Sequence, residues 1–520
     1  MRKIAIYILL ISAGFVTSAQ SSLSFYNLGD ATFQSSNFNP AYIPSDKVMI
    51  GLPVLSGVHL GYNNKLSYND VITKTTEGTQ EIDFKKALSG LQRQNMVSAQ
   101  TSISLFHVAF ATRTKGAISF FANERMEADL LYSEPFMRMI TNGNASTLDE
   151  EISLSDTRAM ATYYREIGVG YAFRNDALGI KIGGRLKYLQ GFANVSTPEN
   201  MRATVKTGDE TYNIDASLEN TILRSSGLNI MDGSTGNLGD HLISNGNRGV
   251  AIDLGMTYKM NDYTTISASL VDVGFISWKE DIENRGISDT SFSYNGINLV
   301  GIWDLEETIK DSLIDKFELD KSFDAYSTIL SPKAYFSYTR GLRNGGDLIT
   351  SVGVRYIQAQ VKTMVGVGYR HKIGEWFTGS VNVTRLPQQF LNLGAAFTVT
   401  GGPVQFYLAA DQVAYWDMTE FKSFDLRLGV NLVFKGKSRH SNENNQGSNP
   451  YFNKITKKKG GGMPEGQSFL GRSIEIRGID GIYNIIRKQR RRALYKINKD
   501  PRGEKRQIER KELPEPPRGD

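Results

Sequence analysis

The stretch that decides the fold is Asp425–Lys437, which reads "DLRLGVNLVFKGK". Five apolar residues, Leu426, Leu428, Val430, Leu432 and Phe434, alternate with Arg427, Gly429 and Asn431. Successive side chains of a strand point to opposite faces, so this stretch has one apolar and one polar face. An apolar face that ends in an aromatic residue is typical of the last strand of a bacterial outer-membrane barrel. Yet 86 residues follow Phe434.

The same alternation recurs earlier in the chain, in the stretches 178–191, 251–260 and 361–371. A soluble sandwich would bury the apolar face and leave the charges in water. An outer-membrane barrel is inverted, with apolar residues toward lipid and polar residues toward the lumen. The inverted pattern predicts that seven residues face the lumen: Lys181, Arg185, Lys187, Asp253, Lys362, Arg370 and Arg427.

Strand length and spacing favour the barrel. The apolar stretches run to ~10 residues, which is what a tilted transmembrane strand needs. Short polar turns at 174–177 and 260–262 alternate with long polar segments at 64–98, 218–247 and 279–329. We therefore predict an all-β, antiparallel outer-membrane barrel of about 14 strands, within a range of 12–16, over residues 47–434. The strand candidates include 116–131, 200–217 and 391–411, the last of which can be split in two at Gly401–Gly402.

Composition supports a strand-rich envelope protein. The 520 residues include 50 Gly, 24 Tyr and 26 Phe, which suits strands and tight turns. Cysteine is absent, and this excludes disulfides, thiol nucleophiles and cysteine-ligated metals. Residues 1–19 resemble a cleaved signal peptide, with Arg2 and Lys3 before a short apolar core and Ala19 before the expected cleavage. We expect the mature chain to lie in the outer membrane of a Gram-negative cell.

Charge divides the chain in two. Residues 435–520 hold 22 Lys and Arg against 10 Asp and Glu, a net of +12, so the remaining 38 basic and 44 acidic residues give −6. Residues 435–466 read as a flexible linker and 467–520 as a basic tail, partly helical or disordered. Its densest basic run contains Arg487, Lys488, Arg490, Arg491 and Arg492.

If Phe434 closes the barrel at its periplasmic side, the tail is periplasmic. Nucleic acid is then excluded as a partner by compartment. The remaining partners are anionic lipid headgroups of the outer membrane, peptidoglycan carboxylates or an acidic periplasmic protein. A basic extension without a dedicated partner is equally compatible with the sequence.

A turn before the first strand candidate carries a family resemblance. Asn39-Pro40-Ala41 lies in an otherwise extended segment, and "GLP" at 51–53, "SYND" at 67–70 and "LVDVGFISW" at 270–278 follow it. With about 14 strands behind it, this arrangement resembles the FadL-like superfamily of long-chain fatty-acid transporters. More closely, it resembles an uncharacterised barrel family of Bacteroidota envelopes. The resemblance spans about residues 25–434.

The FadL-like resemblance implies a hatch, which is an N-terminal segment folded into the lumen. Here the hatch is residues 20–46, with Asn39, Pro40 and Ala41 at its turn. The resemblance also implies a hydrophobic ligand that leaves sideways through a gap made by a kinked strand. The candidate for the kink is 116–131, where charges interrupt the alternation; a loop, or a strand that leaves the membrane early, explains the same residues. The uncharacterised family implies no activity.

Enzyme signatures are poor, and we expect neither catalysis nor a cofactor. None of the five histidines, His59, His107, His241, His371 and His440, lies in a nucleophile motif or in a metal-ligand spacing. Charged inward faces favour a non-transporting barrel that acts as an envelope scaffold, with the tail docking a periplasmic partner. The alternative is a FadL-like uptake channel for a hydrophobic molecule. The third and weakest interpretation is a lipid-modifying barrel enzyme.

Overall fold

The structure is a computed structural model. It describes residues 23–42, 48–74, 79–112, 115–210, 213–228, 246–287, 290–294, 320–385, 391–413, 418–420 and 422–434. The expected signal peptide, linker and basic tail, including Arg487–Arg492, lie outside the described residues, so this division of the chain stays a prediction.

Within these residues, fourteen wall strands form one antiparallel barrel. Two of them are interrupted: β1 (Val48–Gly51) continues as β2 (Val58–Asn63), and β18 (Tyr326–Ile329) continues as β19 (Lys333–Gly341). The other twelve are β5 (Gln94–Ala111), β6 (Gly116–Ser133), β8 (Arg158–Asn175), β9 (Ile180–Ser196), β13 (Arg248–Asn261), β14 (Thr264–Trp278), β20 (Gly346–Ile357), β21 (Gln360–Ile373), β22 (Phe377–Arg385), β23 (Asn392–Gly401), β24 (Val404–Ala410) and β25 (Ser423–Phe434).

The last strand closes the barrel. β25 pairs with β24 on one side and with β1 and β2 on the other, where Val48 lies opposite Phe434. β1 and β2 pair in turn with β5, so the wall has no free edge here. Closure matters because an open sheet edge in lipid would leave backbone groups without hydrogen bonds. The predicted role of 425–434 is confirmed.

The count of fourteen is confirmed, but two strand assignments differ. The 391–411 candidate is two strands, β23 and β24, joined at Gly401 and Gly402. The 200–217 candidate is not in the wall. It forms β10 (Arg202–Thr207) and β11 (Ile214–Glu219), which join β7 (Glu151–Ser153) and β16 (Thr290–Tyr294) in a separate four-stranded sheet. Alternation marks an amphipathic strand, and does not say which sheet the strand joins.

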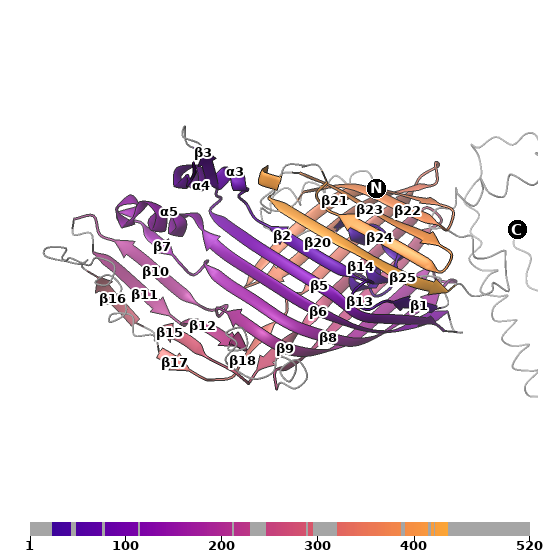
Figure 1. The fold of residues 1–520 in the computed structure, drawn as a ribbon, viewed down its shortest axis with the longest axis horizontal. Coiled ribbons are helices and arrows are strands. Elements are labelled where there is room, and N and C mark those ends of the chain that lie inside the picture. The colour runs from indigo at the N-terminus through magenta and orange to yellow at the C-terminus, as the bar shows by residue number, and fades with distance from the viewer. Residues whose placement is uncertain are drawn as a thin grey trace, which may run out of the picture. The chain divides into compact units, whose positions relative to one another are not determined.

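Long connections gather at one end of the barrel and short turns at the other (Figure 1). The long connections carry α3 (Tyr68–Val71), β3 (Ile72–Lys74), β4 (Gln80–Ile82), α4 (Phe84–Ser89), α5 (Glu134–Asn142), η4 (Asn144–Thr147), β12 (Thr221–Ser226), β15 (Asn284–Ile287), β17 (Asp320–Ser322) and η6 (Met418–Glu420). No helix among the described residues is long and apolar enough to cross a membrane.

The outer face of the wall is apolar. On β8, Ile167, Val169, Tyr171 and Phe173 are 40–48% exposed, whereas the residues between them face inward. Exposed Leu, Val, Phe and Met side chains continue this surface around β6, β9, β13, β20, β21 and β22. A soluble monomer rarely exposes so large an apolar area, and a lipid-facing barrel requires one. The chain is therefore an outer-membrane barrel.

The segment 23–42 lies inside the barrel. It consists of α2 (Leu23–Tyr26), η2 (Gly29–Ala31), η3 (Phe33–Asn37) and the turn that follows. Its side chains are almost entirely buried, and Phe25, Tyr26 and Phe38 pack against the wall residues Tyr335 and Tyr407. We call residues 23–42 the hatch.

Candidate functional site

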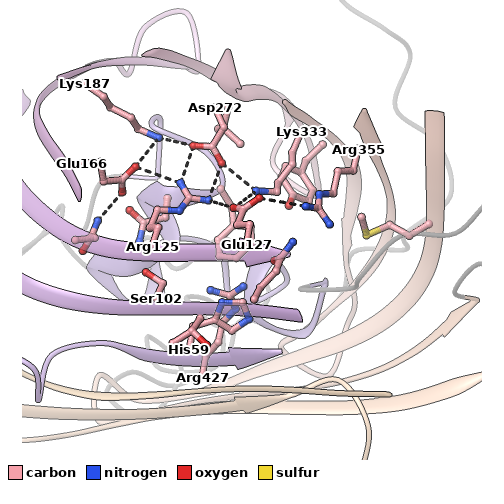
Figure 2. Close-up of a pocket in the computed structure, with 18 residues that line it drawn as sticks. His59, Ser102, Arg125, Glu127, Glu166, Lys187, Asp272, Lys333, Arg355 and Arg427 are labelled. Atoms are coloured by element: carbon pink, nitrogen blue, oxygen red, sulfur yellow. Dashed lines mark hydrogen bonds and ion pairs between the residues drawn. The ribbon is translucent and has the colours of Figure 1, made fainter. Parts of the chain in front are cut away.

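A small cavity lies between the hatch and the wall. It has a volume of about 60 Å³, which is room for only a few water molecules. Figure 2 shows a charged network on one side of it and His59 and Arg427 on the other. Asn37 and Phe38 of the hatch complete the lining. In this conformation the lumen has no room for a fatty-acid-sized molecule at this cavity.

Asp272 of β14 is the centre of the charged network. Arg125 donates to its two carboxylate oxygens at 2.8 and 3.0 Å. Lys187 donates to Oδ1 at 2.6 Å and Lys333 to Oδ2 at 3.0 Å. Glu166 accepts from Arg125 as well, at 3.2 Å. One carboxylate thus holds three cations from β6, β9 and β19.

A β-bulge turns Asp272 into the lumen. The register between β13 and β14 shifts between Ile252 and Leu254, and Asp272 has a left-handed φ of 60°. Asp272 N–H donates to Asp253 Oδ1 at 2.8 Å, which holds the bulge. Bulges re-aim side chains in this way, and Asp tolerates the left-handed region better than most residues.

The network also crosses the lumen. From β20, Arg355 pairs with Asp129 at 2.8 Å and with Glu127 at 3.1 Å, both on β6, which is not its neighbour in the sheet. Lys333 pairs with Glu127 at 3.3 Å. Five cations, of which Arg125 and Lys333 are partly exposed, face five buried carboxylates: Arg125, Arg185, Lys187, Lys333 and Arg355 against Glu127, Asp129, Glu166, Asp253 and Asp272. We call these ten residues the ion network. Its charges balance, as burial requires.

On the opposite side of the cavity, Asp425 of β25 binds two groups. His59 Nε2 lies 2.8 Å from Asp425 Oδ2, and Arg427 Nε lies 3.3 Å from Oδ1. The Arg427 guanidinium also stacks over the Phe38 ring, 4.9 Å from its centroid. This contact ties the hatch to the last strand.

The Asn39-Pro40-Ala41 turn rests on two wall glycines. Gly183 of β9 and Gly255 of β13 lie opposite each other in register. A Cβ at Gly183 would be 2.2 Å from the Pro40 carbonyl oxygen, and one at Gly255 would be 2.1 Å from Asn39 Oδ1. Only glycine leaves room for so close an approach.

Polar side chains hold the rest of the hatch. Arg185 donates to the Ser36 carbonyl at 3.1 Å, and Arg370 to the Asn27 carbonyl at 3.2 Å. Lys181 pairs with Asp30 at 2.8 Å. Three of the seven residues expected in the lumen therefore bind the hatch through polar contacts, and Arg427 is a fourth through Phe38.

All seven of those residues point inward. Besides the hatch-binding Lys181, Arg185 and Arg370, Lys187 and Asp253 belong to the ion network and Arg427 lines the cavity. Lys362 is 4% exposed. Sequence reasoning missed Arg125, Glu127, Asp129, Glu166, Asp272, Lys333 and Arg355. "ERMEAD" at 124–129 carries a signal, because every second residue is charged, but the charges suggested a kink.

The candidate kink in 116–131 is wrong, and so is the loop alternative. β6 is continuous over Gly116–Ser133 and paired with β5 and β8 along its length. Glu124 pairs with Arg165 on the outer face, and Arg125 and Glu127 point inward. The charges therefore follow the alternation of a regular strand.

The wall strands are interrupted instead at residues 330–332, between β18 and β19, and at residues 52–57, between β1 and β2. The second interruption is the longer one. We call residues 52–57 the wall break. Val54 and Leu55 project outward with 50% and 60% exposure, and Val54 has a φ of 63°. A left-handed β-branched residue is strained, at a cost of order 1–3 kcal/mol.

Behind the wall break, Ser56 is fully buried and a second cavity of about 30 Å³ begins. It shares His59, Ser102 and Arg427 with the first cavity. The polar atoms Ser56 Oγ, Ser104 Oγ and His107 Nε2 are buried there, and no described residue forms a hydrogen bond with them. Such groups belong to strained or functional positions, or to sites where water binds.

Among the described residues, no group of His, Asp and Glu is placed to hold a metal ion. His59 and His107 are buried in the lumen, whereas His371 lies near the short turns and contacts Tyr369. His241 and His440 lie outside the described part of the chain.

The chain was compared with known proteins. No curated protein matches it. It is similar to a FadL homologue of Pseudomonas aeruginosa, with 8% identity and a TM-score of 0.38 over 81% of this chain and 99% of that one. It is also similar to the Pseudomonas putida toluene transporter TodX, with 8% identity and a TM-score of 0.34 over 81% and 94%. The Ralstonia pickettii toluene transporter TbuX is similar as well, with 9% identity and a TM-score of 0.34 over 76% of this chain and 92% of that one.

The assignment as an outer-membrane barrel rests on this chain's own strands and outer surface. The expected Bacteroidota origin stays a prediction. A family model described as a family of unknown function, DUF5723, matches residues 40–411, well over half of the chain. The chain therefore belongs to the family of unknown function DUF5723, and the expectation of an uncharacterised barrel family is confirmed.

Proposed function

We propose that this protein passes a small hydrophobic molecule between its lumen and the bilayer, through the wall break, when the hatch moves. The observation that carries the proposal is the wall break itself. Apolar Val54 and Leu55 lie on its lipid side, and two adjoining cavities lie on its lumenal side. A continuous strand would leave no such place in the wall.

The ion network supports a sideways route. A hydrophobic molecule that followed the barrel axis would have to separate paired charges that span the lumen, which costs several kcal/mol for each uncompensated ion. The first cavity lies beside the network, between it and the strands that carry His59 and Arg427 (Figure 2). From there the second cavity leads to the inner side of the wall break.

Hydrogen bonds tie the wall break to both neighbouring strands and to the hatch. Ser104 N–H donates to the Gly57 carbonyl at 2.8 Å, and Gln34 Nε2 and the Tyr407 hydroxyl donate to the Ser56 carbonyl at 2.8 Å. Val54 N–H donates to the Ser104 carbonyl at 2.8 Å, and Val430 N–H donates to the Leu55 carbonyl at 2.8 Å. The strain at Val54 lowers the cost of rearranging this segment. We therefore expect Leu52–Ser56 to rearrange when the hatch moves.

A disulfide across the break tests the route. A Cβ at Gly57 would lie 3.3 Å from the Ser104 Cβ, which is near disulfide spacing, and the chain has no other cysteine. In the double variant Gly57→Cys/Ser104→Cys, called the stapled variant, oxidation forms a disulfide that ties the end of the wall break to β5. We expect cells with the disulfide formed to take up radiolabelled toluene or dodecanoate at least tenfold more slowly than the same cells after the disulfide is reduced.

The reduced form of the stapled variant is the matched control, because it carries the same substitutions. Uptake that is equal before and after reduction, with the disulfide verified on a gel, overturns the proposed route.

A second candidate function is an envelope scaffold. It is favoured by the balanced ion network, which braces β6 against β14, β19 and β20 and needs no solute to be stable. In this interpretation the lumen stays closed, and a periplasmic basic tail docks peptidoglycan or an acidic protein.

Removing the tail separates the two candidates. A chain that ends at Phe434 keeps every described strand, so the barrel should form. If the tail docks a partner, the truncated chain loses a periplasmic protein or peptidoglycan fragment that co-purifies with the full chain, as measured by mass spectrometry. The channel proposal predicts unchanged toluene uptake after the same truncation.

A further inference from the structure

A buried carboxylate holds the first residues of the hatch. Asp411 follows the last residue of β24 and is 3% exposed. Its Oδ1 accepts a hydrogen bond from Ser24 N–H at 2.8 Å. Its Oδ2 is buried and has no hydrogen-bond partner among the residues that the structure describes. Ser24 is also fixed by its hydroxyl, which donates to Asn382 Oδ1 at 2.6 Å.

The charges around Asp411 do not neutralise it. Asp411 N–H donates to the Asp425 carbonyl at 3.0 Å, so Asp411, just after β24, lies beside Asp425 of β25. Arg427 and His59 both pair with Asp425, at 3.3 Å from Oδ1 and 2.8 Å from Oδ2. From the hatch and β22, the described groups that contact Ser24 and its surroundings, such as Asn382 and Ser380, are uncharged.

This environment favours the protonated acid. Burial, and then the neighbouring Asp425 carboxylate, raise the pKa of Asp411 to about 7, although the Ser24 hydrogen bonds and Arg427 act the other way. When the hatch leaves, water reaches Asp411 and its pKa falls toward the ordinary value of ~3.9. Protonation therefore stabilises the closed hatch, and this stabilisation is lost as the pH rises through about 7.

We propose that Asp411 and Ser24 form a latch that keeps the hatch closed while Asp411 is neutral and releases it when Asp411 ionises beside Asp425. The latch rests on the proposed function only in requiring that the hatch moves. It adds the condition under which movement occurs. The latch involves neither the ion network nor the contacts that Gly183 and Gly255 make with the hatch.

Ion current through the full chain in planar bilayers tests the latch between pH 5 and pH 8. We expect the open probability of the unmodified protein to rise more than tenfold over this range. Asp411→Asn imitates the neutral acid, so its open probability should stay at the pH 5 level throughout. Asp176→Asn, in a solvent-exposed turn, is the matched control and should keep the full rise. Heat-modifiable migration on a gel verifies that each barrel is folded.

An Asp411→Asn variant that keeps the rise overturns the latch, and so does an unmodified protein whose open probability is the same at pH 5 and pH 8. Neither result touches the route through the wall break, which the stapled variant tests by uptake. Conversely, unchanged uptake in the stapled variant overturns the route through the wall break. The latch is then still tested by the ion-current measurements.

Discussion

Gly183→Val should turn a closed barrel into a leaky one. The new side chain begins 2.2 Å from the Pro40 carbonyl oxygen, and a backbone atom cannot yield as a side-chain tip can. The Asn39-Pro40-Ala41 turn must leave its seat, and the hatch with it. We expect bilayer conductance at least tenfold above that of the unmodified protein, and increased sensitivity of cells to a large antibiotic such as vancomycin.

The matched control is the next residue. Gly184 points to the outer face, where a Cβ would have its nearest neighbours at 3.7 Å, an ordinary contact. Gly184→Val should therefore leave conductance unchanged. If both variants conduct equally, or neither does, the seat on Gly183 does not hold the lumen closed.

Asp272→Asn should cost more stability than any other single isosteric change in the barrel. The amide keeps the shape of the side chain, and Asn tolerates the left-handed backbone. The substitution removes the negative charge that neutralises Arg125, Lys187 and Lys333. Breaking a buried ion pair on one side costs about 3–5 kcal/mol. The measurement is reversible unfolding in urea from lipid vesicles.

Two comparisons make the stability prediction specific. Asp176→Asn removes an exposed partner of Lys115 and should cost less than about 1 kcal/mol. Adding Lys333→Met to Asp272→Asn should recover part of the loss, because it restores the charge balance. A double variant that is less stable than Asp272→Asn would contradict a network held together by charge balance.

Much of the fold was predictable because alternation is a local property. Each strand of β8, β9, β13, β21 and β25 carries its own apolar face, and the Gly and charged residues between mark the lumen. What alternation cannot give is the sheet that a strand joins. Residues 202–219 alternate like wall strands, yet they form a hairpin in the loops. The 52–57 interruption carries Pro53 and Gly57, but its strain at Val54 is visible only in the structure.

The site was less predictable for a physical reason. The residues that face the lumen can be predicted from the alternation within each single strand. The ion network, in contrast, joins residues far apart in the chain, such as Arg125 with Asp272 and Arg355 with Asp129. Which strands face each other depends on strand number and tilt. Asp272 also needs a bulge to point inward, and nothing in "LVDVGF" shows which residue is the bulged one.

Photolabelling of the purified protein in vesicles, with a fatty acid that carries a diazirine, tests the central claim most directly. A molecule that passes through the wall break contacts it from both sides. We predict that the peptide containing Leu52–Ser56 is labelled several-fold more strongly than equally exposed lipid-facing positions such as Val381 of β22, and that oxidation of the stapled variant removes the excess. Labelling that follows lipid exposure alone, with no excess at 52–56, would contradict passage through this part of the wall.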